Sequence, residues 1–266
     1  MSRNNQFAIP IRYVPRRADV YQSENISNVS TTLSENSDIV FDGEIGIRNK
    51  NTYRNNILSE ILNVKTEEDM IRFHDTYGFW VQFKSEDYVK YHTDSLMNNF
   101  ATVQNIILVM SEAKKEEPDL AVITTAIRKL ISSGEFLGDK IFNFSEIDKS
   151  AVERLTKTNT HTDNLVEIAE QICYACVEHY MPTLPTTPID QTLAINLTDL
   201  LHATFFTLRT IDFERYELIK CKKPSCQRYL IRLKTDTTSL YCSVAHANSD
   251  AQAEFRKRQI IASKGY

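Results

Sequence analysis

Three cysteines and one histidine near the carboxyl end of the chain have the spacing of metal ligands. Four residues separate Cys221 from Cys226, three separate Cys242 from His246, and fifteen lie between the two pairs. Two ligands held in one tight turn can reach a single ion at about 2.0 to 2.3 Å when two to four residues separate them. We therefore expect Cys221, Cys226, Cys242 and His246 to bind one zinc ion.

The donor set favours a structural ion over a catalytic one. A catalytic zinc keeps one coordination position open for water, whereas four protein ligands dominated by thiolate close the site. The competing interpretation is that these residues are ordinary buried cysteines and a solvent-facing histidine. Residues 221–246 contain few large apolar side chains, so a metal would supply folding energy that a core cannot. Asp250 or a distant cysteine is the alternative fourth ligand.

The segments around the ligands predict how they are positioned. Between the pairs, "RYLIRLKTDTTSLY" offers two β-prone arms around turn residues 236–238. Ser243 can cap a helix that begins at the second pair, and His246 lies one turn after Cys242. A knuckle, a hairpin and ligands at a helix start predict a treble-clef-like zinc finger.

The charge of the chain is unevenly distributed. Residues 221–266 carry nine lysines or arginines against three acidic residues, a net charge of +6, so the remainder of the chain carries −10. An acidic body with a basic carboxyl end indicates an anionic partner for that end. The alternative is a basic face that is merely solvated.

A helix after the finger carries the residue types that contact nucleic acids. Steps of four and three place Gln252, Arg256 and Gln259 on one helical face, and Lys257 and Arg258 complete a basic run. Arginine and glutamine can contact both phosphates and base edges in a major groove. We expect these five residues to bind nucleic acid, in particular DNA; a frayed, solvated terminal helix is the alternative.

Two apolar residues predict how this helix is held. Ala251 and Phe255 lie one turn apart, and we expect them to anchor the helix against the finger.

Three quoted segments resemble a known family. "CKKPSCQRY" and "YCS", followed by "AQAEFRKR", resemble the zinc finger at the carboxyl end of bacterial proteins of the CGNR type. Those proteins have an amino-terminal, mostly helical domain called ABATE and are regarded as stress-linked transcriptional regulators. The resemblance covers about 40 residues, and the CGNR signature itself is replaced by "HANS" at residues 246–249. The resemblance implies zinc ligation by Cys221, Cys226 and Cys242, an aromatic position at Tyr229, and a terminal helix bearing Arg256 and Arg258.

The rest of the chain is predicted to be a helical body. Short extended segments are expected at residues 6–14 and 38–47, with a polar loop at 22–37 between them. Helical periodicity then dominates, including a long helix from Ser85 to before Pro118 and helices at 160–180 and 189–209. We predict a mainly α protein with a helical body at residues 1–218, able to sense a small ligand or partner, and a zinc-finger domain at 219–266.

Two further clusters could carry chemistry, but core packing accounts for both. Cys173, Cys176 and His179 follow one another at three-residue steps on a predicted helix, which could form a second metal site or a redox pair. "FHDTYGFW" at residues 73–80 could line a ligand pocket or stack on bases. Because cysteine and aromatic residues are most often buried, we expect both clusters to lie in the core.

Several function classes lack support in the sequence. The chain has six glycines and contains none of the GxGxxG, GxxxxGK[ST], GxSxG and HExxH motifs, so we do not expect an enzyme. No membrane helix or signal peptide is apparent, which predicts a cytoplasmic protein without disulfides. The leading hypothesis is a zinc-finger regulator that binds DNA. The alternative is a protein-interaction adaptor, such as a defence or counter-defence factor, whose finger is purely structural.

Overall fold

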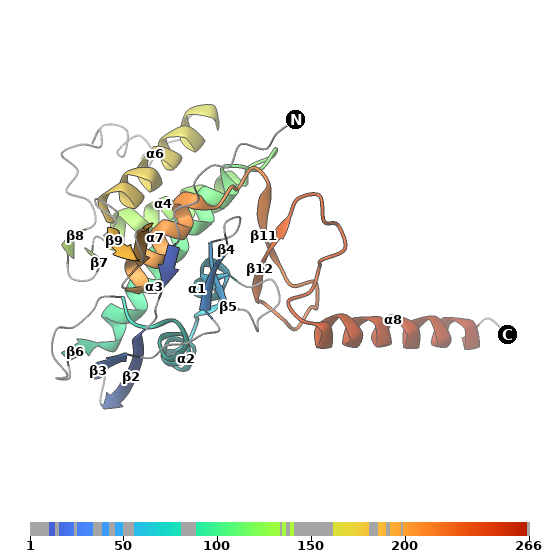
Figure 1. Ribbon diagram of the computed structural model, residues 1–266. Helices are drawn as coiled ribbons and strands as arrows, with labels where there is room; N and C mark the ends of the chain where they lie inside the picture. The colour runs from blue at the N-terminus through green and yellow to red at the C-terminus, as the bar shows by residue number, and fades with distance from the viewer. Residues whose placement is uncertain are drawn as a thin grey trace.

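The computed structural model describes most of the chain as a mainly helical protein with short strands, as predicted (Figure 1). The described residues are 11–13, 16–23, 26–33, 39–42, 46–49, 56–80, 89–133, 135–136, 139–140, 162–180, 186–189, 192–197 and 199–264. Their helices are α1 (Ile57–Asn63), α2 (Glu67–Tyr77), α3 (Thr93–Glu112), α4 (Leu120–Ser133), α6 (Thr162–Tyr180), α7 (Leu200–Thr210) and α8 (Val244–Lys264). Among these helices, none combines the length and apolar character needed to span a lipid bilayer.

The strands form small separate sheets. The strands are β1 (Ile11–Tyr13), β2 (Arg16–Ser23), β3 (Ile26–Leu33), β4 (Ile39–Asp42), β5 (Gly46–Asn49), β6 (Val89–His92), β7 (Glu135–Phe136), β8 (Asp139–Lys140), β9 (Thr186–Ile189), β10 (Thr192–Leu197), β11 (Tyr216–Lys220) and β12 (Tyr229–Leu233). Two sheets have three strands, in the orders β1-β10-β9 and β2-β3-β6, and β4-β5, β7-β8 and β11-β12 are paired hairpins. The β1-β10 pair is parallel and the other pairs are antiparallel. The β4-β5 hairpin agrees with the extended segment predicted at 38–47.

Helix α2 shows how local sequence sets the helix ends near the site. Thr66 is its N-cap, and the Thr66 hydroxyl accepts from the backbone N–H of Asp69 while the Asp69 carboxylate accepts from the N–H of Thr66. This capping box satisfies N–H groups that a helix otherwise leaves unpaired. The helix stops at Gly78, which has a φ of 86°, a conformation that costs glycine little because it lacks a Cβ.

One large core holds the helical body together. It contains residues from α1, α2, α3, α4, α6 and α7. The aromatic cluster at 73–80 lies within it, with Phe73, His74, Tyr77, Phe79 and Trp80 all buried, as the core interpretation predicts.

Three expected elements are wrong in their type or in their first residue. Residues 22–37 contain β3 instead of a loop, because both edges of this strand pair in antiparallel ladders with β2 and β6. The long helix expected from Ser85 begins at Thr93 after β6, while residues 81–88 lie outside the described ones. The helix expected from 189 begins at Leu200, because Asp199 caps it and residues 192–197 pair as β10. In each case the pairing of strands overrides the signal of the local sequence.

The hairpin β11-β12 joins the body to the carboxyl-terminal finger. The sequence predicted a hairpin within residues 228–241, but β12 pairs with β11, which precedes the first cysteine. Successive strand residues point to opposite faces. Leu218 and Ile231 pair with each other and belong to the main core, whereas Ile219 and Leu230 pair and lie in a second, smaller core.

The two-sided burial of the hairpin bears on the domain organisation. The domain boundary predicted at 218/219 falls inside β11, so the same hairpin contributes to the body and to the finger. Beyond it, α8 extends away from the body (Figure 1).

Candidate metal centre

The fold brings the four predicted ligands to one place. Cys221 directly follows β11, Cys226 lies in the loop before β12, Cys242 precedes α8, and His246 is in the first turn of α8. Their ligand atoms all lie within 4.8 Å of one another. Residues separated by up to 25 positions therefore converge, and the group could hold a metal ion.

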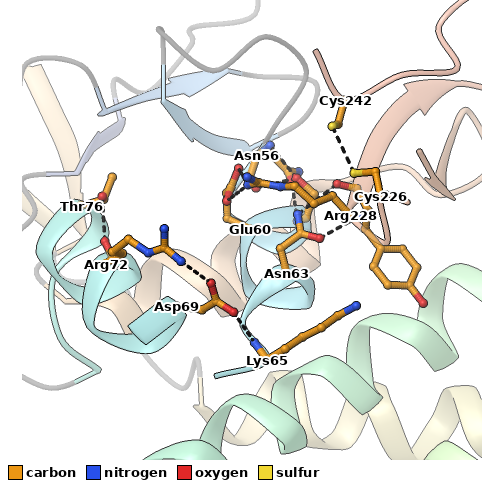
Figure 2. Close-up of polar contacts among 12 residues, drawn as sticks. Asn56, Glu60, Asn63, Lys65, Asp69, Arg72, Thr76, Cys226, Arg228 and Cys242 are labelled. Carbon is orange, nitrogen blue, oxygen red and sulfur yellow. Dashed lines mark hydrogen bonds and ion pairs between the residues drawn. The ribbon is translucent and has the colours of Figure 1, made fainter. Parts of the chain in front are cut away.

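Three of the distances within the cluster are close to the edges of a tetrahedral site. Metal bonds of about 2.3 Å to sulfur and 2.0 to 2.1 Å to nitrogen, meeting at the tetrahedral angle, separate two sulfurs by about 3.8 Å and a sulfur from a nitrogen by about 3.5 Å. The Sγ atoms of Cys226 and Cys242 are 3.7 Å apart, and Nδ1 of His246 is 3.6 Å from Sγ of Cys221 and 3.2 Å from Sγ of Cys242 (Figure 2 shows the Cys226–Cys242 pair). Small side-chain movements would place all four around one ion.

Backbone hydrogen bonds shape the first pair of ligands into a knuckle. The N–H of Cys221 donates to the carbonyl of Arg228 over 2.8 Å, and the N–H of Cys226 donates to the carbonyl of Lys223 over 2.8 Å. The second bond closes the tight turn that aims both thiols to the same side, as the spacing predicts.

Clustering of the thiols perturbs their acidity. Burial, hydrogen bonds with Cys226 and Cys221, and the charges of those two residues raise the pKa of the Cys242 thiol to about 12. Burial opposes ionisation of Cys221 as well, but backbone N–H groups of Cys242 and Lys223 donate to its sulfur and hold its pKa below the ordinary value. Thiolates packed this closely repel one another, and a bound cation relieves that repulsion.

The second pair of ligands is held at a capped helix start. The hydroxyl of Ser243 accepts from the N–H of His246 over 3.2 Å, in agreement with the predicted cap. Asp250, the alternative fourth ligand, accepts a hydrogen bond from the Tyr241 hydroxyl instead. The loop before this pair is pinned by Asp236, whose carboxylate accepts from the N–H groups of Thr238 and Ser239. The predicted turn at 236–238 is thus present, although its second arm forms no strand.

A small apolar core backs the cluster. Cys221, Cys226 and Leu230 are buried together, with Ile219, Tyr241 and Cys242 packed against them. So few apolar residues would not fold alone, which is the condition under which a metal contributes folding energy.

Polar contacts attach this finger to helix α1. The side chain of Asn63 pairs with both backbone groups of Tyr229: Nδ2 donates to the carbonyl over 3.1 Å, and Oδ1 accepts from the N–H over 2.7 Å. Arg228 donates to both carboxylate oxygens of Glu60 at 2.9 and 3.2 Å (Figure 2). Sequence reasoning missed these contacts, and it also missed the cleft that Glu60, Asn63 and Arg228 help to line, because the partners are more than 160 positions apart.

All five residues predicted to bind nucleic acid lie on α8 and are exposed. They are Gln252, Arg256, Lys257, Arg258 and Gln259. The expected anchoring of this helix by Phe255 is wrong: the side chain is 61% exposed, and Ala251 is exposed as well. The small core beside the cluster is formed by residues of the hairpin and of the loops that carry the three cysteines, and it includes no described residue of α8.

The second cysteine cluster behaves as core packing. Cys173 and Cys176 are buried in the main core, whereas His179 is exposed, so the three do not share one face. Burial raises the pKa of Cys173 well above its ordinary value and that of Cys176 to about 12, which keeps both as unreactive thiols.

Comparisons with protein-family models, with curated proteins and with solved structures found no match to this chain.

Proposed function

We propose that Cys221, Cys226, Cys242 and His246 hold a structural zinc ion. The observation that carries this proposal is the convergence of three sulfurs and one imidazole nitrogen within 4.8 Å, with three of their separations close to tetrahedral edges. Three thiolates and one imidazole are a frequent donor set for structural zinc. The ion would stabilise the finger by linking the β11-β12 loop to the start of α8.

Metal analysis of purified protein tests this assignment. We expect one zinc per chain, lost largely in Cys242→Ala and His246→Ala because each change opens the tetrahedral set. Cys176→Ala is the matched control, since it removes a buried thiol outside the cluster. Full zinc retention by both ligand variants would contradict the proposal.

We further propose that the finger presents α8 to DNA. The 21 residues of this helix span about 31 Å, and an α-helix fits the major groove of B-DNA. Residues 251–261 are all exposed, so the helix is free to enter a groove without unfolding any packed surface. The supporting observations are this exposure and the basic composition of the carboxyl end.

The helical geometry assigns different roles to the three basic residues. Successive residues are rotated by about 100°, so Arg256 shares a face with Gln252 and Gln259, while Lys257 and Arg258 lie about 130° from the centre of that face, one on each side. Arg256 would then meet base edges, and the long side chains of Lys257 and Arg258 would reach back toward phosphates on either side of the groove. The ion pair of Lys257 with Glu254, at 3.2 Å, is exposed and contributes little stability. Lys257 can therefore leave this pair to contact a phosphate.

Salt-dependent binding to a labelled DNA duplex tests the second part. In fluorescence anisotropy, Lys257→Gln/Arg258→Gln should weaken binding and reduce the slope of log K against log salt by up to about 1.8, because each phosphate contact contributes about 0.9. Arg128→Gln/Lys129→Gln is the matched control, an adjacent exposed pair on α4. DNA binding that is undetectable, or equal in both double variants, would refute a role for α8.

A protein-docking function is the second candidate, and the apolar residues of α8 favour it. Phe255, Ile260 and Ile261 are 61%, 54% and 72% exposed. Large exposed apolar side chains on one element are typical of interaction surfaces. Phe255→Ser would abolish capture of a protein partner under this hypothesis and would leave salt-sensitive DNA binding intact under the first.

A further inference from the structure

A cleft of about 470 Å³ lies where the finger meets helices α1 and α2. Its polar lining includes Glu60, Asn63, Lys65, Arg72, Gln227 and Arg228. Figure 2 shows the charged groups that face one another across it, with Arg72 and Asp69 on α2 and the Glu60–Arg228 pair toward the finger. The volume is in the range of sites that hold small molecules.

The acceptor groups of the cleft are already engaged. Glu60 accepts from Arg228 through both carboxylate oxygens. Asp69 accepts from Arg72 at Oδ1 and from the backbone N–H groups of Lys65 and Thr66 at Oδ2. A cationic ligand would have to displace one of these donors to reach a carboxylate.

The donor groups are in excess. An arginine side chain has five N–H donors. Within the described part of the chain, Arg228 uses only Nη2, and Arg72 uses Nε to the carbonyl of Glu68 and Nη2 to Asp69. The Lys65 ammonium makes one long hydrogen bond of 3.4 Å, to the carbonyl of Gln227, and no ion pair with a described carboxylate. An anion can therefore be bound without breaking an existing pair.

We propose that this cleft binds a small organic anion through a carboxylate or phosphate group, with Lys65 as its principal cation. Arg72 and Arg228 donate from either side, and their carboxylate partners hold the guanidinium groups in place. Gln227 and Arg228 directly follow the metal ligand Cys226, so the anion contacts the body and the finger together. This site is separate from α8 and does not depend on nucleic-acid binding.

Amide chemical-shift titration of the metal-loaded full chain tests the proposal, with inorganic phosphate and succinate as separate probes. Sodium chloride at equal ionic strength is the reference. Saturable shifts at residues 63–69 and 227–228 with either probe support the site, and the probe that binds more tightly identifies the anionic group. No saturable shift there with either probe overturns the proposal.

Two variants test whether residues of the cleft contribute to anion binding. Lys65→Gln removes the ammonium group and Gln227→Glu adds a carboxylate to the cleft, and each should weaken binding of the preferred probe by about fivefold to tenfold. Lys129→Gln, an exposed lysine on α4, is the matched control and should leave affinity within about twofold. Zinc content and circular dichroism confirm that each variant is folded. If both cleft variants bind like the wild type, or if Lys257→Gln/Arg258→Gln abolishes the shifts, the anion binds elsewhere and the proposal is wrong.

Discussion

Leu230 and Ile231, which are adjacent in β12, allow a test of whether the small core supports the candidate metal centre. Leu230 is 0% exposed and packs with Cys221 and Cys226, whereas Ile231 is 3% exposed and packs in the main core. The two side chains are similar in volume and nearly equal in burial, but they point to opposite faces of the hairpin. Leu230→Ala and Ile231→Ala therefore form a matched pair.

The expected magnitudes follow from their surroundings. Truncation of a buried leucine or isoleucine to alanine costs about 2 to 5 kcal/mol, and we take about 3 kcal/mol for each. In the Leu230 variant this energy is lost from the finger, whose folding we expect to be linked to metal binding. A loss of about 3 kcal/mol corresponds to zinc affinity weakened by roughly 100-fold. In the Ile231 variant the loss falls on the body, so zinc affinity should change by less than about threefold.

Competition with a chromophoric zinc chelator measures the affinity, and urea denaturation of the zinc-loaded protein measures the stability. Leu230→Ala should lower both quantities, and Ile231→Ala should lower mainly the stability. Equal losses of zinc affinity in the two variants would refute the idea that the hairpin separates two cores. Unchanged zinc affinity in Leu230→Ala would show that the small core does not support the metal site.

Two further predictions concern the buried His74 and the side chain of Asn63. Burial lowers the pKa of His74 to about 4, although its hydrogen bond to the Gly78 carbonyl opposes this shift. The unfolded state therefore binds more protons than the native state as the pH falls below about 6.5. The wild type should therefore lose about 2 kcal/mol more stability than His74→Gln between pH 7.5 and 5 in chemical denaturation, and equal losses would contradict this. Asn63→Ala should destabilise the protein by about 1 to 3 kcal/mol because it leaves both backbone groups of Tyr229 without their partner, whereas exposed Asn98→Ala should have little effect.

The geometry of β11 and β12 lets one hairpin support both the main core and the small core beside the candidate metal centre. Consecutive apolar residues at 218–219 and 230–231 send one side chain to each core. Neither the body nor the finger can lose this hairpin without exposing apolar surface of the other. A ligand bound in the cleft beside α1 would contact both the body and the finger.

The sequence by itself determined the features that depend on short-range spacing. The pairs Cys221–Cys226 and Cys242–His246 each fit a single turn, so their types and intervals were enough to predict the two halves of one candidate metal site. Capping chemistry likewise fixed the ends of α2, since Thr66, Asp69 and Gly78 act within a few residues of one another. The mainly helical character followed from apolar periodicity in the same way.

Only the tertiary structure decided which segments meet. The strand partner of β12 is β11 and not the segment after the turn at 236–238, because pairing there buries apolar residues on two faces at once. The exposure of Phe255 and the cleft around Lys65 have the same origin, since both depend on which surfaces the hairpin and α1 already cover. Local spacing carries no information about such coverage, because the contacts between α1 and the finger join residues more than 160 positions apart.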